Sequence, residues 1–348
     1  MKAGAVIRQF SLVCCALCLL AGPAQAQNDG GVAAPAPQAK PTATPTPDAR
    51  PSGSQTPKSP AQVPQNQGPT FRVNVRLVNV FTTVTDSHGT PIANLGKDDF
   101  RVLEDGVPQS VNVFDRESEL PLSIVLAIDT SQSTVREFKL EVTSARKFVH
   151  SIMRPVDRLS VFQVTENVDQ IVPFTADVQR IQHGIDRLQV GAGTSLYDAI
   201  FLASDALINR EGRKVLVLIT DGGDTTSRAD YNRALKRAQQ AEAIVYSIIV
   251  VPVEADAGRN TGGEHALIQI SHDTGGKHYY ADSLGELDDA FRQISDELRT
   301  QYLLAYYPSR PLADSPFRRI EVQLVKKPEE AKTYKVRHRA GYYTAPSK

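Results

Sequence analysis

The stretch 122–133, LSIVLAIDTSQS, joins an unbroken apolar run to a group of oxygen-bearing side chains. The apolar part, 122–128, is typical of a strand buried on both faces of a parallel sheet. Similar runs stand at 215–219 and 244–251, and 159–164 with 170–174 indicate two more strands. Apolar residues recur at helical spacing over 138–152 and 284–298. This alternation predicts an α/β domain over 120–300, a doubly wound and mostly parallel sheet flanked by helices.

Polar residues follow two of these strands and precede one helix. Asp129, Ser131 and Ser133 come directly after 122–128, Asp221 follows 215–219, and Thr194 precedes the apolar helical face of 196–207. Ligands of doubly wound sheets bind beyond the carboxyl ends of the strands, so we expect these five side chains to lie together. Hydroxyl and carboxylate oxygens with several retained waters suit Mg²⁺. The sequence therefore predicts a magnesium site, with Mn²⁺ and Ca²⁺ as alternatives.

Each of these residues also has a simpler explanation. Taken singly, Ser133 or Thr194 is better explained as a helix cap, and Asp221-Gly222 is a common turn. If capping is their whole role, the chain is a purely structural module. The Gly-rich stretch 191–193 is expected to be able to shift, which would make Thr194 the ligand most able to change its contact.

Two β-rich segments, 70–119 and 301–348, flank the α/β pattern. Apolar residues alternate over 71–77, a turn follows at 86–89, and a hairpin is predicted between 100–103 and 111–114 around Asp105-Gly106. Further strands are expected at 302–307, 320–324 and 333–339. Because neither segment easily closes a core alone, we predict a β-sandwich-like element that both segments build together, with the α/β domain inserted in it.

Residues 1–26 have the pattern of a secretory signal peptide. Lys2 and Arg8 precede an apolar run at 10–20, and Ala24-Gln25-Ala26 is a small-x-small cleavage site. An uncleaved anchor is the alternative, but the run is about half of the roughly 20 residues that a spanning helix needs. We therefore predict an exported protein, periplasmic, cell-surface or secreted, with no transmembrane segment in the mature chain.

The cysteines, the Pro-rich segment and the charge balance exclude some kinds of site and partner. All 3 cysteines lie within 1–26, so the mature chain is expected to form no disulfide and no thiolate metal site. Residues 27–69 are rich in Pro, Ala, Thr, Gln and Ser and predict a disordered tether, either a spacer or an export leader with no further role. The whole chain has 39 basic and 39 acidic residues, which gives no indication of a nucleic-acid partner.

The spaced oxygen ligands also carry a family resemblance. The motif DTSQS at 129–133, Thr194 in GAGTSLYDA and Asp221 in ITDG resemble the metal-ion-dependent adhesion site of von Willebrand factor type A domains. The resemblance implies a Rossmann-like fold, with Ser131, Ser133 and Thr194 as direct Mg²⁺ ligands and with Asp129 and Asp221 holding bound waters. The flanks 84–91, 95–106, 302–308 and 340–343 are similar to a bacterial family of exported proteins that carry this domain.

A protein-binding module is the function that these features favour. Three protein oxygens and a few waters leave one coordination position open, and we expect an Asp or Glu carboxylate of a partner protein to fill it. The sequence does not indicate an oligomeric state. The alternative is a Mg²⁺-dependent phosphatase of the haloacid dehalogenase type, but such enzymes need a second Asp where Ser131 stands. The Gly-rich stretch 191–193 could suggest a phosphate-binding loop, but no Lys follows it. The 7 histidines form no pattern typical of a metal site or of a nucleophile with its base. We therefore predict that the chain is not an enzyme.

Overall fold

The computed structural model describes residues 76–116, 119–131, 138–251, 261–325 and 334–344. Ser133, the predicted signal peptide and the predicted tether lie outside these residues. Among the described residues, no helix is long and apolar enough to cross a membrane.

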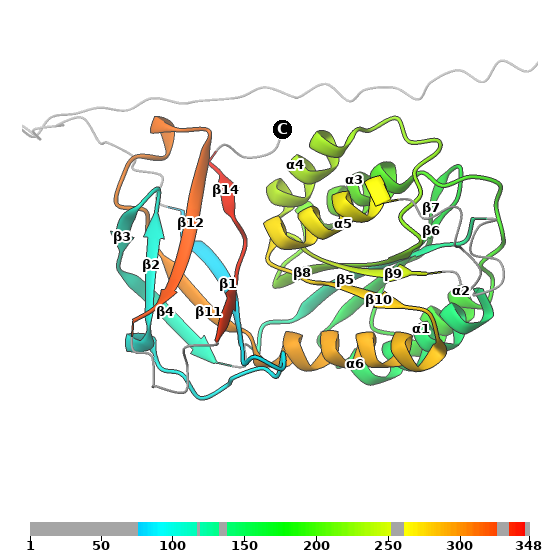
Figure 1. The fold of residues 1–348 in the computed structure, drawn as a ribbon, viewed down its shortest axis with the longest axis horizontal. Coiled ribbons are helices and arrows are strands. Elements are labelled where there is room, and N and C mark those ends of the chain that lie inside the picture. The colour runs from blue at the N-terminus through cyan, green and yellow to red at the C-terminus, as the bar shows by residue number, and fades with distance from the viewer. Residues whose placement is uncertain (1–75, 117–118, 132–137, 252–260, 326–333, 345–348) are drawn as a thin grey trace, which may run out of the picture. The chain divides into compact units, whose positions relative to one another are not determined.

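A six-stranded sheet forms the centre of the α/β part, in the order β10-β9-β8-β5-β6-β7 (Figure 1). Its strands are β5 (Leu122–Asp129), β6 (Arg158–Val164), β7 (Val168–Thr175), β8 (Arg213–Thr220), β9 (Ile244–Val250) and β10 (His278–Ala281). All neighbouring pairs are parallel except β6 and β7, which are antiparallel. The predicted doubly wound, mostly parallel sheet is therefore confirmed.

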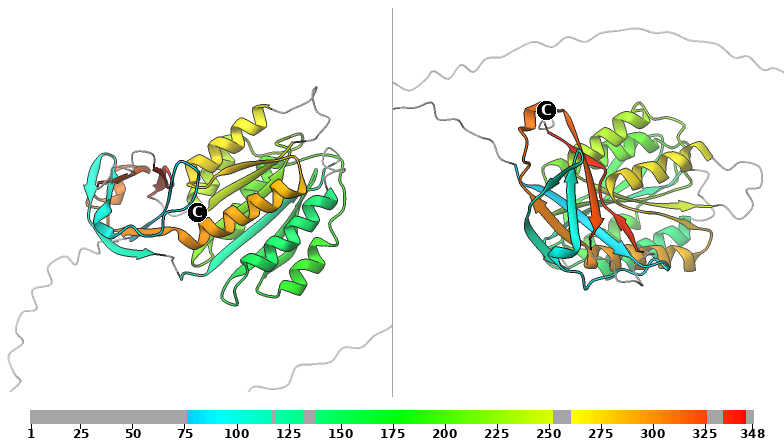
Figure 2. Two further views of the ribbon diagram at one scale, coloured as in Figure 1. Left: turned by 60° about the horizontal axis from the view of Figure 1, so that its bottom comes forward. Right: turned by 60° about the vertical axis from the view of Figure 1, so that its left-hand side comes forward.

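Helices cover both faces of this sheet. They are α1 (Phe138–Ile152), α2 (Val178–Ile185), α3 (Leu196–Ile208), α4 (Tyr231–Ala241), α5 (Thr261–Thr274) and α6 (Leu284–Thr300). Ile124, Leu126 and Ile128 of β5 pack with α1, α2 and α6, whereas Val125 and Ala127 pack with α3, α4 and α5 (Figures 1 and 2). Since alternate side chains of a strand point to opposite faces, every residue of 122–128 is buried, as its continuous apolar run predicts.

Two four-stranded antiparallel sheets make up the sandwich, in the orders β13-β1-β11-β4 and β14-β12-β2-β3. Their strands are β1 (Val78–Thr85), β2 (Phe100–Glu104), β3 (Val107–Gln109), β4 (Val111–Arg116), β11 (Tyr302–Tyr306), β12 (Phe317–Leu324), β13 (Lys335–Arg337) and β14 (Gly341–Tyr343). Each sheet combines strands from before and after the α/β part, and one buried cluster joins both sheets. The predicted sandwich of the two flanking segments is confirmed.

One detail of the flanking prediction is wrong, and another lies mostly outside the described residues. The hairpin partner of β2 is β3, not 111–114, because Asp105 and Gly106 both adopt positive φ and form a two-residue turn that returns the chain at once. The chain then changes sheets, and β4 pairs with β11. Residues 71–75 of the strand predicted at 71–77 lie outside the described part, and the first described strand is 78–85. The sequence pattern does not indicate strand 78–85, because buried threonines at 82, 83 and 85 interrupt the alternation of apolar and polar residues.

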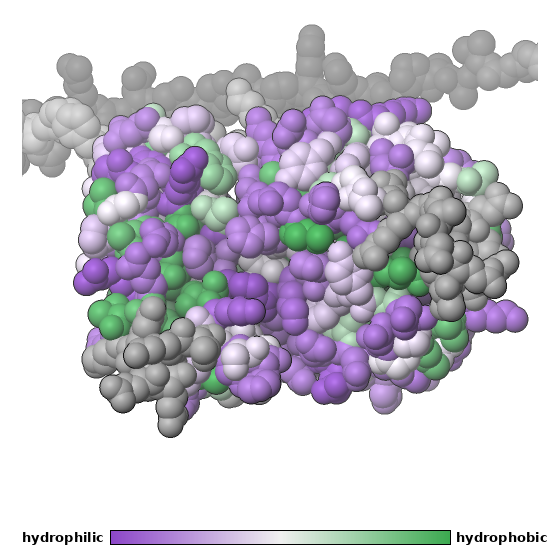
Figure 3. Space-filling model, viewed as in Figure 1, coloured by the Kyte–Doolittle hydropathy of each residue, from purple (hydrophilic) through white to green (hydrophobic). Residues whose placement is uncertain are grey.

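The surface of the described residues is mainly polar. Figure 3 shows one face, on which hydrophobic residues form small separate patches rather than one continuous area. Val107, Val113 and Val325 of the sandwich are among the exposed apolar residues. Isolated exposed apolar residues are normal on soluble proteins and mark no site by themselves.

A buried polar cluster links the two ends of the chain inside the sandwich. Glu104 of β2 accepts hydrogen bonds from the hydroxyls of Tyr306 and Tyr342, each at 2.8 Å. Arg318 of β12 donates to the same carboxylate at 3.1 Å, and the side chains of Arg318 and Glu104 are fully buried. Because a buried charge is costly without its partner, this pair holds the N-terminal and C-terminal segments together.

Replacing Arg318 with Met is expected to destabilise the chain by about 3–5 kcal/mol, because Glu104 then keeps a buried charge without its counter-charge. Chemical unfolding of the chain from residue 27 onward measures this change. Arg319→Met is the matched control, since its side chain is exposed on the neighbouring position, and it should leave the unfolding midpoint nearly unchanged. Equal midpoints for the two variants would show that the Glu104 cluster does not stabilise the sandwich.

Candidate metal centre

Asp129 ends the central strand β5 and is fully buried. The parallel pairing of β5 with β8 runs to Ile128 and Ile219, which brings Asp129 level with Thr220. The Thr220 hydroxyl donates to Asp129 Oδ2 at 2.7 Å, and the Ser131 backbone N–H donates to Oδ1 at 3.0 Å. Burial raises the pKa of Asp129 to about 6, although these two hydrogen bonds oppose the rise. A carboxylate in this position would be stabilised by a nearby cation.

Ser131 is buried in a segment that neighbouring loops hold in place. It forms a parallel bridge with Gly191, whose N–H donates to Thr130 O at 2.9 Å. Thr130 in turn donates from its N–H to Val164 O at 2.9 Å and from its hydroxyl to Gln189 O at 2.7 Å. The residues after β5 are thus attached both to the end of β6 and to the 189–191 loop.

Thr194 lies on that same loop and is only 3% exposed. Its N–H donates to Thr225 Oγ1 at 2.9 Å, and its carbonyl accepts from Thr225 N–H at 2.8 Å. Ser195, not Thr194, is the N-cap position of α3, and the carboxylate of Asp224 accepts the Leu196 N–H at 2.9 Å. Within the described part of the chain, the Thr194 hydroxyl forms no hydrogen bond. The capping explanation of Thr194 is therefore wrong, and its hydroxyl is available to a ligand.

Asp221 follows β8 and is partly exposed. Its Oδ1 accepts the Gly223 N–H at 2.8 Å. The negative charge of Asp221 contributes to the raised pKa of Asp129, after the larger effect of burial, so the two carboxylates are close enough to repel one another. A divalent cation would neutralise this repulsion.

Several residues that organise the centre were missed by the sequence analysis. The carboxylate of Glu166 accepts the N–H groups of Ala192 and Gly193 at 2.9 and 3.3 Å. Hydrogen bonds from its own backbone N–H and from these two lower the pKa of Glu166. Glu166 lies two residues after the end of β6, as Ser131 lies two residues after the end of β5, so position after a strand could have indicated it. The sequence around Asp224 and Thr225 does not indicate their roles, because both residues bind backbone groups of a different loop, at 194–196.

The donor set fits a hard cation. Asp129, Ser131, Thr194 and Asp221 bring only oxygen atoms, on adjoining loops at the carboxyl ends of β5 and β8, and Ser133 lies outside the described residues. The buried carboxylate of Asp129 and the Thr194 hydroxyl, which forms no hydrogen bond in the described residues, are groups that Mg²⁺ could use. Among the described residues, no group of three His, Cys, Asp or Glu side chains could hold a metal by itself.

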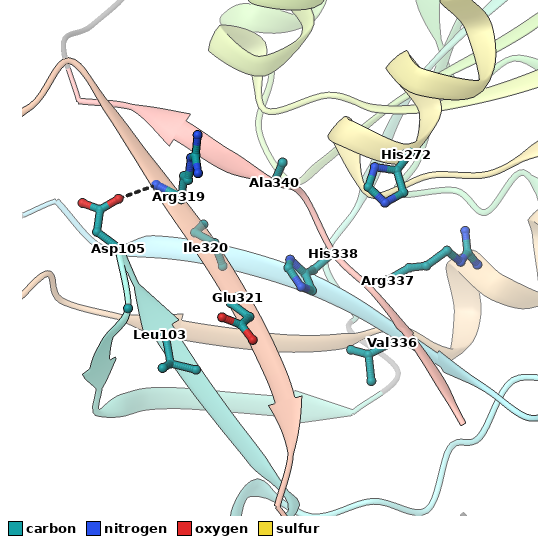
Figure 4. Close-up of a pocket in the computed structure, with 11 residues that line it drawn as sticks. Leu103, Asp105, His272, Arg319, Ile320, Glu321, Val336, Arg337, His338 and Ala340 are labelled. Atoms are coloured by element: carbon teal, nitrogen blue, oxygen red, sulfur yellow. Dashed lines mark hydrogen bonds between the residues drawn. The ribbon is translucent and has the colours of Figure 1, made fainter. Parts of the chain in front are cut away.

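A cavity of about 710 Å³ lies elsewhere, against the sandwich (Figure 4). It is lined by residues of β12 and of 336–340 and by His272 of α5, and none of the predicted site residues lines it. His338 cannot act there as a metal ligand, because its Nε2 accepts the Val322 N–H at 3.1 Å and its Nδ1 lies 2.8 Å from Arg339 O. The size of this cavity therefore does not make it the better candidate site.

The chain was compared with proteins of known structure. It has 17% identity to BatB from Bacteroides thetaiotaomicron, with a TM-score of 0.42 over 51% of this chain and 100% of that one. A von Willebrand factor type A protein from Catenulispora acidiphila has 16% identity and a TM-score of 0.44, over 66% and 52% of the two chains. The von Willebrand factor domain of the pilus tip protein Mfa5 from Porphyromonas gingivalis has 13% identity and a TM-score of 0.42, over 51% and 94%.

The family match is more direct than these similarities. No curated protein sequence matches the chain. Because each of the three TM-scores is below 0.5, we base the assignment on the sequence match and on the chain's own topology. Residues 124–223, from the middle of β5 to the loop after β8, match the von Willebrand factor type A domain. The chain therefore contains a von Willebrand factor type A domain.

Proposed function

We propose that this chain is an exported module that binds a partner protein through Mg²⁺ held by Asp129, Ser131, Ser133, Thr194 and Asp221. The observation that carries the proposal is the pairing of a fully buried carboxylate, Asp129, with the Thr194 hydroxyl, which forms no hydrogen bond in the described residues. Burying the Asp129 carboxylate is costly, and a bound cation would compensate this cost, while the Thr194 hydroxyl is available as a ligand. Purely structural caps would not leave this hydroxyl unused.

The five proposed residues would have two different roles in binding the ion. The hydroxyls of Ser131, Ser133 and Thr194 would bind the ion, while Asp129 and Asp221 would hold its waters and balance its charge. When bound, Mg²⁺ supplies positive charge and an open coordination position for an Asp or Glu carboxylate of the partner. Thr220 keeps Asp129 in place through its 2.7 Å hydrogen bond, so this carboxylate is oriented before any ion arrives.

Binding explains the centre better than hydrolysis does. A phosphatase of the haloacid dehalogenase type would need a second carboxylate two residues after Asp129 as acid and base. Ser131 stands at that position, and its N–H already serves as a donor to Asp129. The described residues of the centre include no histidine that could replace the missing group. We therefore propose a non-enzymatic role.

The N-terminal segments complete the proposal. Residues 1–26 would direct export and be removed, and residues 27–69 would hold the folded part away from its point of attachment or serve only as a leader. These segments lie outside the described residues, so their composition alone supports this part of the proposal.

Mg²⁺ is expected to raise the unfolding temperature of the wild-type chain, since an ion that binds only the folded state stabilises it by about 2.7 kcal/mol at one hundred times its Kd. Asp129→Asn should abolish this response while the metal-free variant stays folded, because a buried amide costs less than a buried carboxylate. Thermal unfolding with and without Mg²⁺ measures both effects. Asp289→Ala, on the exposed surface of α6, should respond like the wild type. An unchanged response in Asp129→Asn would contradict the site.

Partner binding should depend on the same ion. Wild-type protein, immobilised and exposed to the exported protein fraction of its source cells, is expected to retain a partner in Mg²⁺ and to release it when a chelator is added. Asp129→Asn should retain none in either condition, and Asp289→Ala should behave as the wild type. Retention of the same protein in chelator would show that the metal is not part of the interface.

A further inference from the structure

One short segment of the loop after β8 holds the backbone of Thr194 from both sides. The Thr194 N–H donates to Thr225 Oγ1 at 2.9 Å. The Thr194 carbonyl accepts the N–H groups of Thr225 and Thr226 at 2.8 and 3.2 Å, and Thr225 Oγ1 lies 3.3 Å from the same carbonyl oxygen. The Thr225 hydroxyl can thus accept from Thr194 with a lone pair and donate to it with its proton.

The packing around Gly193 leaves this loop little room. A Cβ placed on Gly193 would lie 3.1 Å from Thr225 Oγ1 and 3.2 Å from Thr226 Cγ2, and 3.6 Å from Glu166 Cβ on the other side. Both distances to the threonines are shorter than ordinary van der Waals contacts. The glycines therefore allow a close approach between two loops, and the expected freedom of 191–193 to shift is not what the contacts indicate.

Thr194 consequently belongs to the same rigid unit as Asp221. Asp221 and Thr225 lie four residues apart on one loop, and Asp224 of that loop also accepts the N–H groups of Leu196 and Tyr197 at 2.9 and 3.4 Å. Any movement of the Thr194 backbone relative to this loop would have to break these hydrogen bonds. The backbone segments that carry two of the proposed metal ligands are in this way held together before metal binding.

We propose that Thr225 is a positioning residue of the metal centre, whose hydroxyl holds the backbone from which the Thr194 hydroxyl projects, without touching the ion. The proposal rests on the proposed function for the identity of the ion, but the contact between Thr225 and Thr194 is independent of it. Residues that orient metal ligands typically change metal affinity by about ten- to hundredfold when they are replaced.

Thr225→Val is the sharpest variant, because it replaces the hydroxyl with a methyl group of similar size. The Thr194 N–H loses its acceptor, and a methyl carbon cannot lie 2.9 Å from a backbone nitrogen, so the loop has to retreat. Thr225→Ala removes the hydroxyl without adding a methyl group in its place and serves if the valine variant does not fold. Thr225→Ser restores the hydroxyl and should restore the wild-type behaviour.

Thr226→Val is the matched control. Thr226 stands next to Thr225 on the same loop, but its hydroxyl lies 2.8 Å from Ser195 Oγ and does not contact Thr194. Its backbone N–H, which binds the Thr194 carbonyl, is unaffected by the substitution. A general loosening of the loop would therefore affect both valine variants, whereas a positioning role affects Thr225 alone.

Two measurements test the proposal on the chain from residue 27 onward. Calorimetric titration with Mg²⁺ should show a Kd about ten- to hundredfold weaker in Thr225→Val and Thr225→Ala, and within about threefold of wild type in Thr225→Ser and Thr226→Val. Amide hydrogen exchange of the metal-free proteins should show faster exchange of the Thr194 N–H only in the variants that lack the Thr225 hydroxyl.

The outcomes separate this proposal from the proposed function. Wild-type Mg²⁺ affinity and a protected Thr194 N–H in Thr225→Val would overturn the positioning role, and so would an equal loss of affinity in Thr226→Val. If the wild-type chain itself does not bind Mg²⁺, the proposed function fails. In that case, the exchange of the Thr194 N–H still decides whether Thr225 holds Thr194 in place.

Discussion

The hydrogen bond between Thr220 and Asp129 is the contact on which the candidate centre depends. It joins the ends of β5 and β8, the neighbouring central strands, through two side chains that are both fully buried. The same Thr220 hydroxyl accepts the Gly222 N–H at 3.0 Å, where Gly222 has a φ of +85° that favours glycine. One hydroxyl thus fixes the buried carboxylate and also starts the turn that carries Asp221, so the two proposed acidic groups share one support.

The loops around this contact satisfy one another's polar groups. Glu166 binds the amides of 192–193, Asp224 binds those at the start of α3, and Asp198 of α3 accepts the N–H groups of Arg228 and Ala229 at 3.0 and 2.8 Å. Three loops that are distant in sequence therefore form one connected hydrogen-bond network that satisfies these backbone N–H groups. Such support keeps ligands oriented, which lowers the cost of ordering them when an ion binds.

The sequence predicts those parts of this arrangement that depend on one segment alone. Continuous apolar runs identify β5, β8 and β9, and the residues that follow them identify Asp129 and Asp221. Contacts between segments were not predictable in this way. The pairing of β2 with β3 was missed because β3 has only three residues and no apolar alternation, and Thr225 was missed because its role depends on which loop lies beside it. Ser133 stays a prediction.

The sandwich meets the α/β part at the opposite ends of the strands from the candidate centre. Arg213, at the start of β8, lies against the Phe81 ring of β1 and binds Leu298 O at the end of α6, and Gln301 leads directly from α6 into β11 (Figure 1). Glu297 of α6 also accepts from Thr83 of β1 and contacts Arg337 of β13. A strand of eight residues, such as β5, rises by about 3.3 Å per residue. The sandwich is thus attached about a strand length away from Asp129, at the edge of the sheet opposite to the proposed metal ligands.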